Sequence, residues 1–142
     1  MIIRIVIVLL PILLFGQDSC EICGVWLEEK KESHIKIYQT KEKTIEGKII
    51  WLANPLNEDG EIKLDKENPN KNLRQRTIQN LTIIKELKFT EKNKWSNGSI
   101  YDARSGKTYS LNAKLEGKDT LFMRGYLGFS LIGKTTRWTR VK

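Results

Sequence analysis

Alternating apolar and polar residues recur along the chain and predict a series of β-strands. In residues 33–39, Ile35 and Ile37 alternate with His34 and Lys36. Successive side chains of a strand point to opposite faces, so this spacing places the two isoleucines together on one face. Similar patterns, rich in β-branched and aromatic residues, occur in eight stretches. They are residues 23–28, 33–39, 44–52, 81–89, 94–101, 107–115, 120–127 and 134–141.

Most segments between these stretches are short and polar, which favours an antiparallel meander. Residues 40–43 and 116–119, for example, leave room for little more than a turn, and strands joined by turns pair as antiparallel neighbours. A twisted meander of eight strands removes its exposed edges by closing on itself. The sequence therefore predicts an all-β fold, an eight-stranded up-and-down barrel whose interior is filled by side chains or holds one small ligand.

One connection is much longer than the others and is the first candidate for a lid or a binding loop. It holds 28 residues between Leu52 and Leu81, that is, between the third and fourth predicted strands. Loops of this length inside a compact domain are usually functional or disordered. Apolar residues spaced along this one favour order, and a short helical turn is expected around residues 70–76.

The N-terminus has the pattern of a signal peptide. Arg4 is followed by an apolar run from Ile5 to Phe15 and by the small residue Gly16, and the run is shorter than the roughly 20 apolar residues of a membrane-spanning helix. We expect cleavage after Gly16, so that residues 1–16 are removed and residues 17–142 form a single domain. The chain is thus expected to be exported, to the periplasm or beyond the cell.

Net charge and cysteine content argue against a few functions, namely nucleic-acid binding and a redox or metal site. The net charge is +8, but the lysines are scattered singly, which is typical of a solvated surface, and nucleic acid is not expected as a partner because stacking aromatics are not interleaved with them. Cys20 and Cys23 are expected to form a short disulfide, or to remain thiols, rather than a redox or metal site. His34 is the only histidine, and neither a metal nor a cofactor is expected.

Several stretches together resemble an exported bacterial family known as domain of unknown function 2147. The stretches are residues 24–27, residues 64–70 leading to 73–76, residues 98–102 with 106–109, and residues 123–130 continuing through 137–140. The resemblance implies a lipocalin-like barrel in the envelope of Gram-negative bacteria, with no established activity and no catalytic residues to transfer. Cys20 and Cys23 depart from the usual pattern of this family.

A second resemblance concerns one end of the barrel. Gly24 and Trp26 on the first strand, with an arginine on the last strand, are similar to the calycin arrangement, in which an arginine packs over the tryptophan and closes that end. Cation–π attraction and burial of the ring are its physical basis. Arg137 and Arg140 are both candidates for this structural role.

The remaining candidate residues have both a binding and a structural interpretation. Arg74 and Arg76 suit a carboxylate or phosphate ligand, or else tie the long connection to its own acidic residues. Asp102 more often caps a turn than binds a ligand, and Arg124 is more often a solvated arginine than a buried cation. The residues proposed to contact a ligand are Trp51, Arg74, Arg76, Tyr101, Asp102, Tyr109 and Arg124.

The hypothesis that follows is a non-enzymatic, exported barrel that binds a small or amphipathic ligand or a component of the envelope. One alternative is a structural or protein-binding module with a packed barrel, marked by an apolar patch such as residues 129–132. Another is a hydrolase that uses Asp65, Asp102 or His34, which would require these groups to converge in one pocket. The sequence leaves the ligand and the oligomeric state open.

Overall fold

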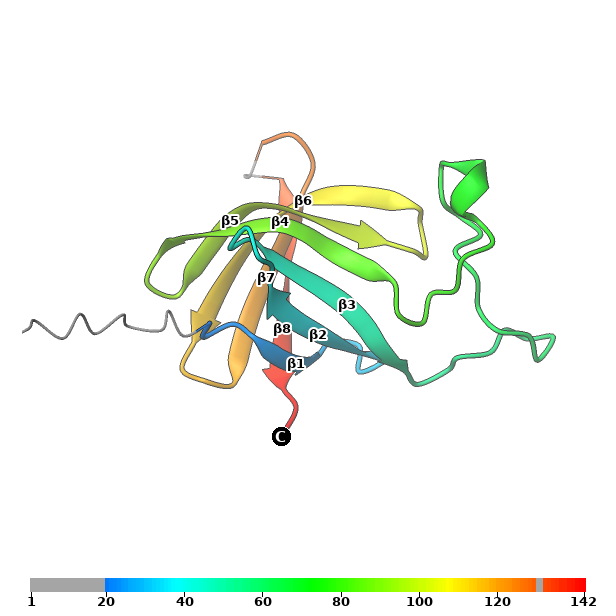
Figure 1. Cartoon of the computed structure of the whole chain (residues 1–142), viewed down its shortest axis with the longest axis horizontal. Helices are drawn as coiled ribbons and strands as arrows, with labels where there is room; N and C mark the ends of the chain where they lie inside the picture. Colours follow the sequence, from blue (N-terminus) through cyan, green and yellow to red (C-terminus); the bar gives the residue numbers. More distant parts are fainter. Residues whose placement is uncertain (1–19, 130–131) are drawn as a thin grey trace, which may run out of the picture.

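The chain forms a closed barrel of eight antiparallel strands, as seen in a computed structural model that describes residues 20–129 and 132–142 (Figure 1). The predicted signal peptide and the predicted cleavage after Gly16 lie outside the described residues. The strands are β1 (Gly24–Leu27), β2 (Ser33–Gln39), β3 (Ile45–Leu52), β4 (Thr82–Glu91), β5 (Lys94–Asp102), β6 (Lys107–Glu116), β7 (Thr120–Tyr126) and β8 (Gly133–Arg140); a short 3-10 helix, η1 (Lys71–Leu73), lies between β3 and β4.

Each strand pairs with the next, and β8 closes the barrel by pairing with β1 through Trp26↔Arg140 and Leu27↔Thr139. This confirms the predicted all-β, up-and-down barrel. The expected helical turn is η1, whose first N–H groups are capped by the Asn70 side chain. Among the described residues, no helix is long and apolar enough to cross a membrane.

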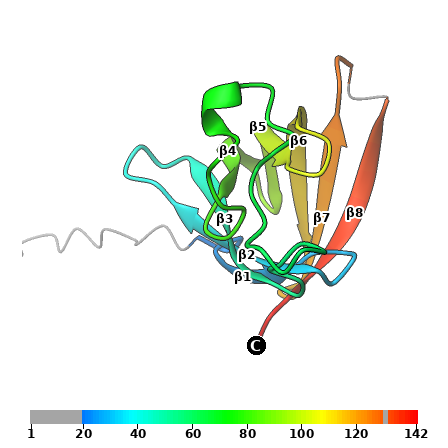
Figure 2. The same cartoon turned by 90° about the vertical axis from the view of Figure 1, so that its right-hand side faces the viewer.

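Up-and-down order separates the connections into two ends. The mouth end, as we call it, carries the loops β1–β2, β3–β4, β5–β6 and β7–β8, and the closed end carries the other turns together with residues 20–23. Residues 53–81 between β3 and β4, which we call the connection, extend beyond the strands at the mouth end (Figure 1) and lie in front of them when that end faces the viewer (Figure 2).

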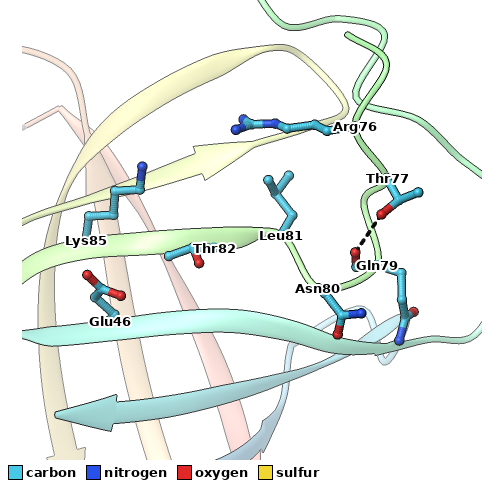
Figure 3. A pocket seen from close by; sticks show the side chains of 8 residues that line it. All are labelled: Glu46, Arg76, Thr77, Gln79, Asn80, Leu81, Thr82 and Lys85. Carbon is cyan, nitrogen blue, oxygen red and sulfur yellow. Dashed lines mark hydrogen bonds between the residues drawn. The ribbon is translucent and has the colours of Figure 1, made fainter. Parts of the chain in front are cut away.

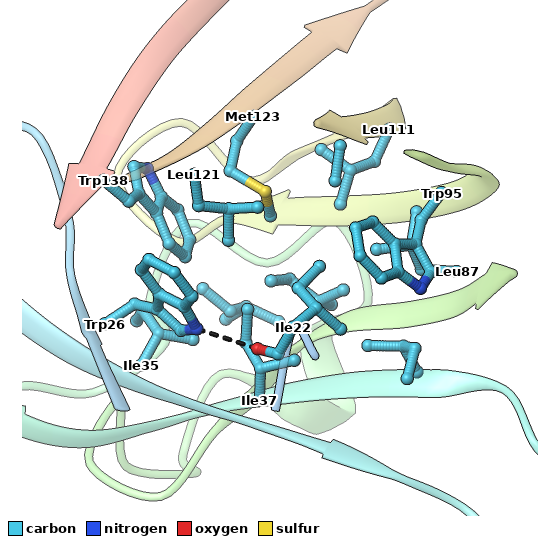
Figure 4. Packing of buried hydrophobic residues seen from close by; sticks show 14 of the residues in the cluster. Ile22, Trp26, Ile35, Ile37, Leu87, Trp95, Leu111, Leu121, Met123 and Trp138 are labelled. Carbon is cyan, nitrogen blue, oxygen red and sulfur yellow. Dashed lines mark hydrogen bonds between the residues drawn. The ribbon is translucent and has the colours of Figure 1, made fainter. Parts of the chain in front are cut away.

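Apolar side chains fill the interior, as the alternating pattern predicts. Three of the four tryptophans of the chain are buried, Trp26 at 0% exposure and Trp95 and Trp138 at 5% each. Figure 4 shows Trp26 next to Trp138, with Leu121 beside Trp138 and Ile35 beside Trp26. An eight-stranded barrel has just enough interior for its own side chains or one small ligand, and here large rings occupy much of it.

The closed end is held by Arg140. Its guanidinium lies 4.3 Å from the ring centre of Trp26 and donates hydrogen bonds to the backbone carbonyls of Cys23 at 2.7 Å, Glu21 at 2.8 Å and Lys118 at 2.7 Å. These bonds join the segment before β1 to the β6–β7 turn, so a cation and an indole ring close the barrel floor together.

Four other residues named from the sequence lie near the closed end or on β8. Arg137 is exposed, and its backbone N–H donates to Glu29, so the structure places Arg140 rather than Arg137 over Trp26. Gly24 has a φ of 136°, and a Cβ there would lie 2.5 Å from an Arg140 nitrogen. Cys20 and Cys23 form a disulfide.

Candidate functional site

A buried carboxylate fastens the connection to the barrel. Asp65 has 0% exposure and accepts hydrogen bonds from the Tyr101 hydroxyl at 2.5 Å, from Arg76 Nε at 2.8 Å and from the Asn68 side-chain amide at 2.8 Å. A charge is tolerated in an interior only when it is paired and hydrogen-bonded. The donors come from the connection and from β5, so Asp65 links the two.

Tyr101 provides the barrel's part of this link. Burial raises its pKa, and the hydrogen bond to Asp65 and the charge of that carboxylate raise it further, from 10.0 to about 12. The guanidinium of Arg76 lies 5.9 Å from the centre of the Tyr101 ring. Tyr101 therefore stays a neutral donor over the physiological range, and its hydroxyl is engaged with Asp65.

The β5–β6 turn also contacts the connection, at Glu67. Asp102 accepts hydrogen bonds from the Arg104 backbone N–H and the Ser105 hydroxyl, both at 3.0 Å, which is the turn-capping geometry of an aspartate. Gly106 has a φ of 71°, and a Cβ there would lie only 2.0 Å from the Glu67 carbonyl oxygen. The connection thus rests directly on the turn at a position where only glycine leaves room.

A cavity of about 490 Å³ lies between the end of the connection and strands β3 and β4. The connection forms one part of its wall, and strands β3 and β4 form the other. Figure 3 shows the Arg76 side chain extending above Leu81 while Glu46 lies on the opposite wall. Residues of the connection are Arg76, Thr77, Gln79, Asn80 and Leu81, and residues of the strands are Glu46, Thr82 and Lys85.

Two cations, Arg76 and Lys85, and one carboxylate, Glu46, lie on these walls. Lys85 is exposed and has no ion-pair partner among the described residues, and the Asn80 side-chain amide likewise has no hydrogen-bond partner there. The carboxylate of Glu46 already accepts a hydrogen bond from Tyr38 at 2.7 Å; burial, followed by this bond and the charge of Glu46, raises the Tyr38 pKa. The cavity therefore suits a ligand with acceptor oxygens.

Among the sequence-derived candidates, the two arginines of the connection have structural contacts. Arg76 pairs with Asp65 and also lines the cavity, so both of its interpretations are compatible with the geometry. Arg74 donates from Nε to the Asn68 carbonyl at 2.7 Å. The connection therefore uses both side chains to hold its own shape, and only Arg76 reaches the cavity.

Trp51 does not take the predicted face. Regular alternation along residues 44–52 predicts that Trp51 lies on the same face as Ile49, but that prediction is wrong, because β2 pairs Ile35 with Ile49 and His34 with Trp51. The extra residue in β3 turns Trp51 to the outer side. Its ring lies 4.5 Å from that of His34 and remains 42% exposed.

Tyr109 and Arg124 lie away from this cavity. Tyr109 pairs with Ile100 near the mouth, on the inward face that it shares with the buried Leu111. Arg124 follows the buried Met123 and so lies on the outer face, where it donates to Thr135 at 3.2 Å. It lines a second cavity of about 480 Å³ on the outer wall of β5–β8. The predicted residues are therefore not brought together in one site.

The sequence analysis missed several residues of the cavity. Glu46, Gln79, Asn80 and Lys85 line the cavity but are not among the candidates proposed from the sequence. Asn80 has a φ of 68°, and asparagine is one of the few residues that tolerate this conformation, which is a weak local signal for a tight turn before β4. Within the described part of the chain, no cluster of three or more potential ligands could hold a metal ion.

Comparisons with known proteins agree with this architecture. No curated protein matches the sequence. Among solved structures, protein HP1028 from Helicobacter pylori, described as belonging to the lipocalin family, matches with a TM-score of 0.75 and 23% identity, over 87% of this chain and 85% of that one. That likeness shows a lipocalin-like fold. Residues 24–140 match the model of a family described as "uncharacterized protein conserved in bacteria". The chain therefore belongs to the family of domain of unknown function 2147.

Proposed function

We propose that this protein binds a small, acid-bearing ligand on the outer wall of β3 and β4, in the cavity beside the end of the connection, without catalysing a reaction. The observation that carries the proposal is a 490 Å³ cavity lined by two cationic side chains, Arg76 and Lys85, and one carboxylate, Glu46. Small-molecule sites commonly enclose about 300–1,000 Å³ and orient their ligand with a few polar groups. Packing of three tryptophans into the interior further favours a site outside the barrel lumen.

The chemistry of the walls narrows the class of ligand. Arg76 uses Nε for Asp65, which leaves its terminal nitrogens for a second acceptor, and Lys85 adds a point charge. A carboxylate or phosphate group matches these two donors. Leu81 offers an apolar contact on the same wall, so the ligand is best described as small and amphipathic, with an acidic head.

Native mass spectrometry of the protein purified from its own cells tests this proposal. We expect a bound mass that leaves on denaturation and that is reduced in Lys85→Ala. Lys88→Ala is the matched control, because Lys88 is an exposed lysine of the same strand that does not line the cavity. Equal retention of the ligand by both variants would place the ligand elsewhere and refute this site.

We also propose that the protein acts outside the cytosol, in the periplasm or beyond. The pattern of residues 1–16 supports export, and a disulfide between Cys20 and Cys23 suits an oxidising compartment. N-terminal sequencing of the protein from a periplasmic extract should begin at or near Gln17. Recovery of the intact N-terminus from the cytosol would contradict export.

A further inference from the structure

Exposed apolar side chains gather at one end of this barrel. Among the described residues, eight large hydrophobic side chains are exposed, and only Phe89 lies towards the closed end. The other seven are on the connection, at its junction with β3 or on the β7–β8 loop: Trp51, Leu56, Ile62, Leu73, Leu127, Phe129 and Ile132. Single exposed apolar residues are normal, but a concentration of them marks an interaction surface.

The β7–β8 loop presents the most exposed members of this group. Leu127 is 54% exposed, Phe129 84% and Ile132 77%. The β7–β8 loop is separated from the connection by the β5–β6 turn on one side and by the β1–β2 turn on the other, in the order of strands around the barrel. It therefore lies across the barrel from the cavity beside the end of the connection, and its apolar side chains form a separate surface.

Unpaired cations surround this loop. Lys30, Lys31, Lys107 and Lys134 are exposed, stand on the adjoining turns and strand ends, and have no carboxylate partner among the described residues.

The acidic groups of the adjoining turns accept hydrogen bonds from backbone N–H groups or pair with an arginine, and Glu29 accepts from the Arg137 backbone N–H at 3.1 Å. Glu28 accepts hydrogen bonds from two backbone N–H groups of its own turn, and Glu32 pairs with Arg104 at 3.2 Å. Asp102 caps the β5–β6 turn. Together, the turns and strand ends around the loop carry five cations against four carboxylates, so their formal charge is slightly positive; the cations are Lys30, Lys31, Arg104, Lys107 and Lys134, and the carboxylates are Glu28, Glu29, Glu32 and Asp102.

The opposite side of the mouth differs in sign. Leu56 and Ile62 are also exposed, but they flank a turn that contains Glu58, Asp59 and Glu61. An anionic surface would repel that turn and attract the lysines beside the β7–β8 loop. The two groups of exposed apolar side chains at the mouth end therefore differ in the charge of their neighbours. Only the group on the β7–β8 side suits an anionic surface.

We propose that the β7–β8 side of the mouth end docks onto an anionic lipid bilayer. Leu127, Phe129 and Ile132 would enter the boundary between headgroups and acyl chains, while Lys107 and Lys134 contact the lipid phosphates. Apolar insertion and attraction to anionic lipids together determine interfacial binding. This inference is independent of the ligand proposed for the cavity, since the two surfaces share no residue.

Co-sedimentation with vesicles tests the docking surface. We expect the protein to bind vesicles of phosphatidylcholine mixed with phosphatidylglycerol, to bind pure phosphatidylcholine more weakly, and to dissociate as salt is raised. Phe129→Ser should lower the partition coefficient about tenfold or more, because a large apolar side chain no longer inserts. Lys134→Glu should weaken binding to the mixed vesicles only.

Phe89→Ser is the matched control, because Phe89 is 63% exposed on a strand but lies towards the closed end. It should leave vesicle binding unchanged. Both variants share the same residues 1–16, so the difference between them does not depend on the N-terminal apolar run. Equal loss in both, or no binding of the unchanged protein to anionic vesicles, would overturn the proposal. So would a dimer in sedimentation velocity that Phe129→Ser dissociates, since the surface would then belong to a second copy.

Discussion

Replacing Tyr101 by phenylalanine removes one hydroxyl from the link between the connection and β5. Asp65 would keep its bonds to Arg76 and Asn68, each 2.8 Å long, but would lose the 2.5 Å bond from Tyr101. A hydrogen bond to a charged group contributes about 1.5–3 kcal/mol. Because Asp65 is fully buried and keeps two donors, we expect the free energy of unfolding to fall by about 2 kcal/mol.

Urea unfolding followed by tryptophan fluorescence measures this loss, and Tyr126→Phe is the control. Tyr126 is half-buried, and its hydroxyl has no hydrogen-bond partner among the described residues. The control should stay within about 0.5 kcal/mol of the unchanged protein. If Tyr101→Phe does the same, the hydroxyl of Tyr101 does not stabilise the global fold.

Hydrogen exchange distinguishes global destabilisation from local opening of the connection. The backbone N–H of Asp65 donates to the Arg76 carbonyl, and that of Ile78 to the Lys63 carbonyl. Loops can open separately from the barrel, so these two amides should exchange faster in Tyr101→Phe even where the barrel holds. Unchanged stability together with unchanged exchange at both amides would refute the idea that Asp65 fastens the connection.

Three further predictions concern other contacts of the fold. In a spectroscopic titration, one tyrosine should ionise near pH 12, because burial and then Asp65 raise the Tyr101 pKa to about 12. The stability that Tyr101 contributes is complete below about pH 10 and is lost as the pH rises through about 12. This alkaline loss of stability should be absent in Tyr101→Phe. Gly106→Ala should cost about 3 kcal/mol from backbone strain and overlap with the connection, whereas Gly117→Ala, at a φ of 63° in open space, should cost only about 1 kcal/mol in thermal or urea unfolding. Arg140→Met should lower the free energy of unfolding by about 3 kcal/mol, and the exposed Arg137→Met by less than about 0.5 kcal/mol.

Strands and barrel closure were predictable because alternation is a local property. Ile35 and Ile37 are both 1% exposed, as their spacing predicts. Trp51 was placed on the wrong face because a single extra residue in β3 reverses every later side chain. Nothing in the residues around Trp51 marks that bulge, since it arises from pairing with the neighbouring strand.

Only part of the role of Asp65 could be read from the sequence: an ion pair with an arginine of the connection was one interpretation of Arg76, but the burial of Asp65 and its bond to Tyr101 depend on distant partners. The hydroxyl that it accepts belongs to a residue 36 positions away, and the guanidinium to one 11 positions away. A charged residue in a polar loop is normally exposed, and only tertiary contacts make burial tolerable. The cavity could not be predicted either, because its walls combine the connection with Glu46 and Lys85, which are distant in the sequence.

The choice between a filled and a hollow barrel also lies beyond alternation. Eight alternating strands define which side chains point inward, but whether they leave space depends on their combined volume and on how the rings pack. Trp26, Trp95 and Trp138 all point inward here and are almost fully buried. A lipocalin-like fold whose interior is occupied in this way offers binding surfaces chiefly at its ends and on its walls. Its most informative residues are therefore those that the strand pattern leaves unassigned, on the connection and the β7–β8 loop.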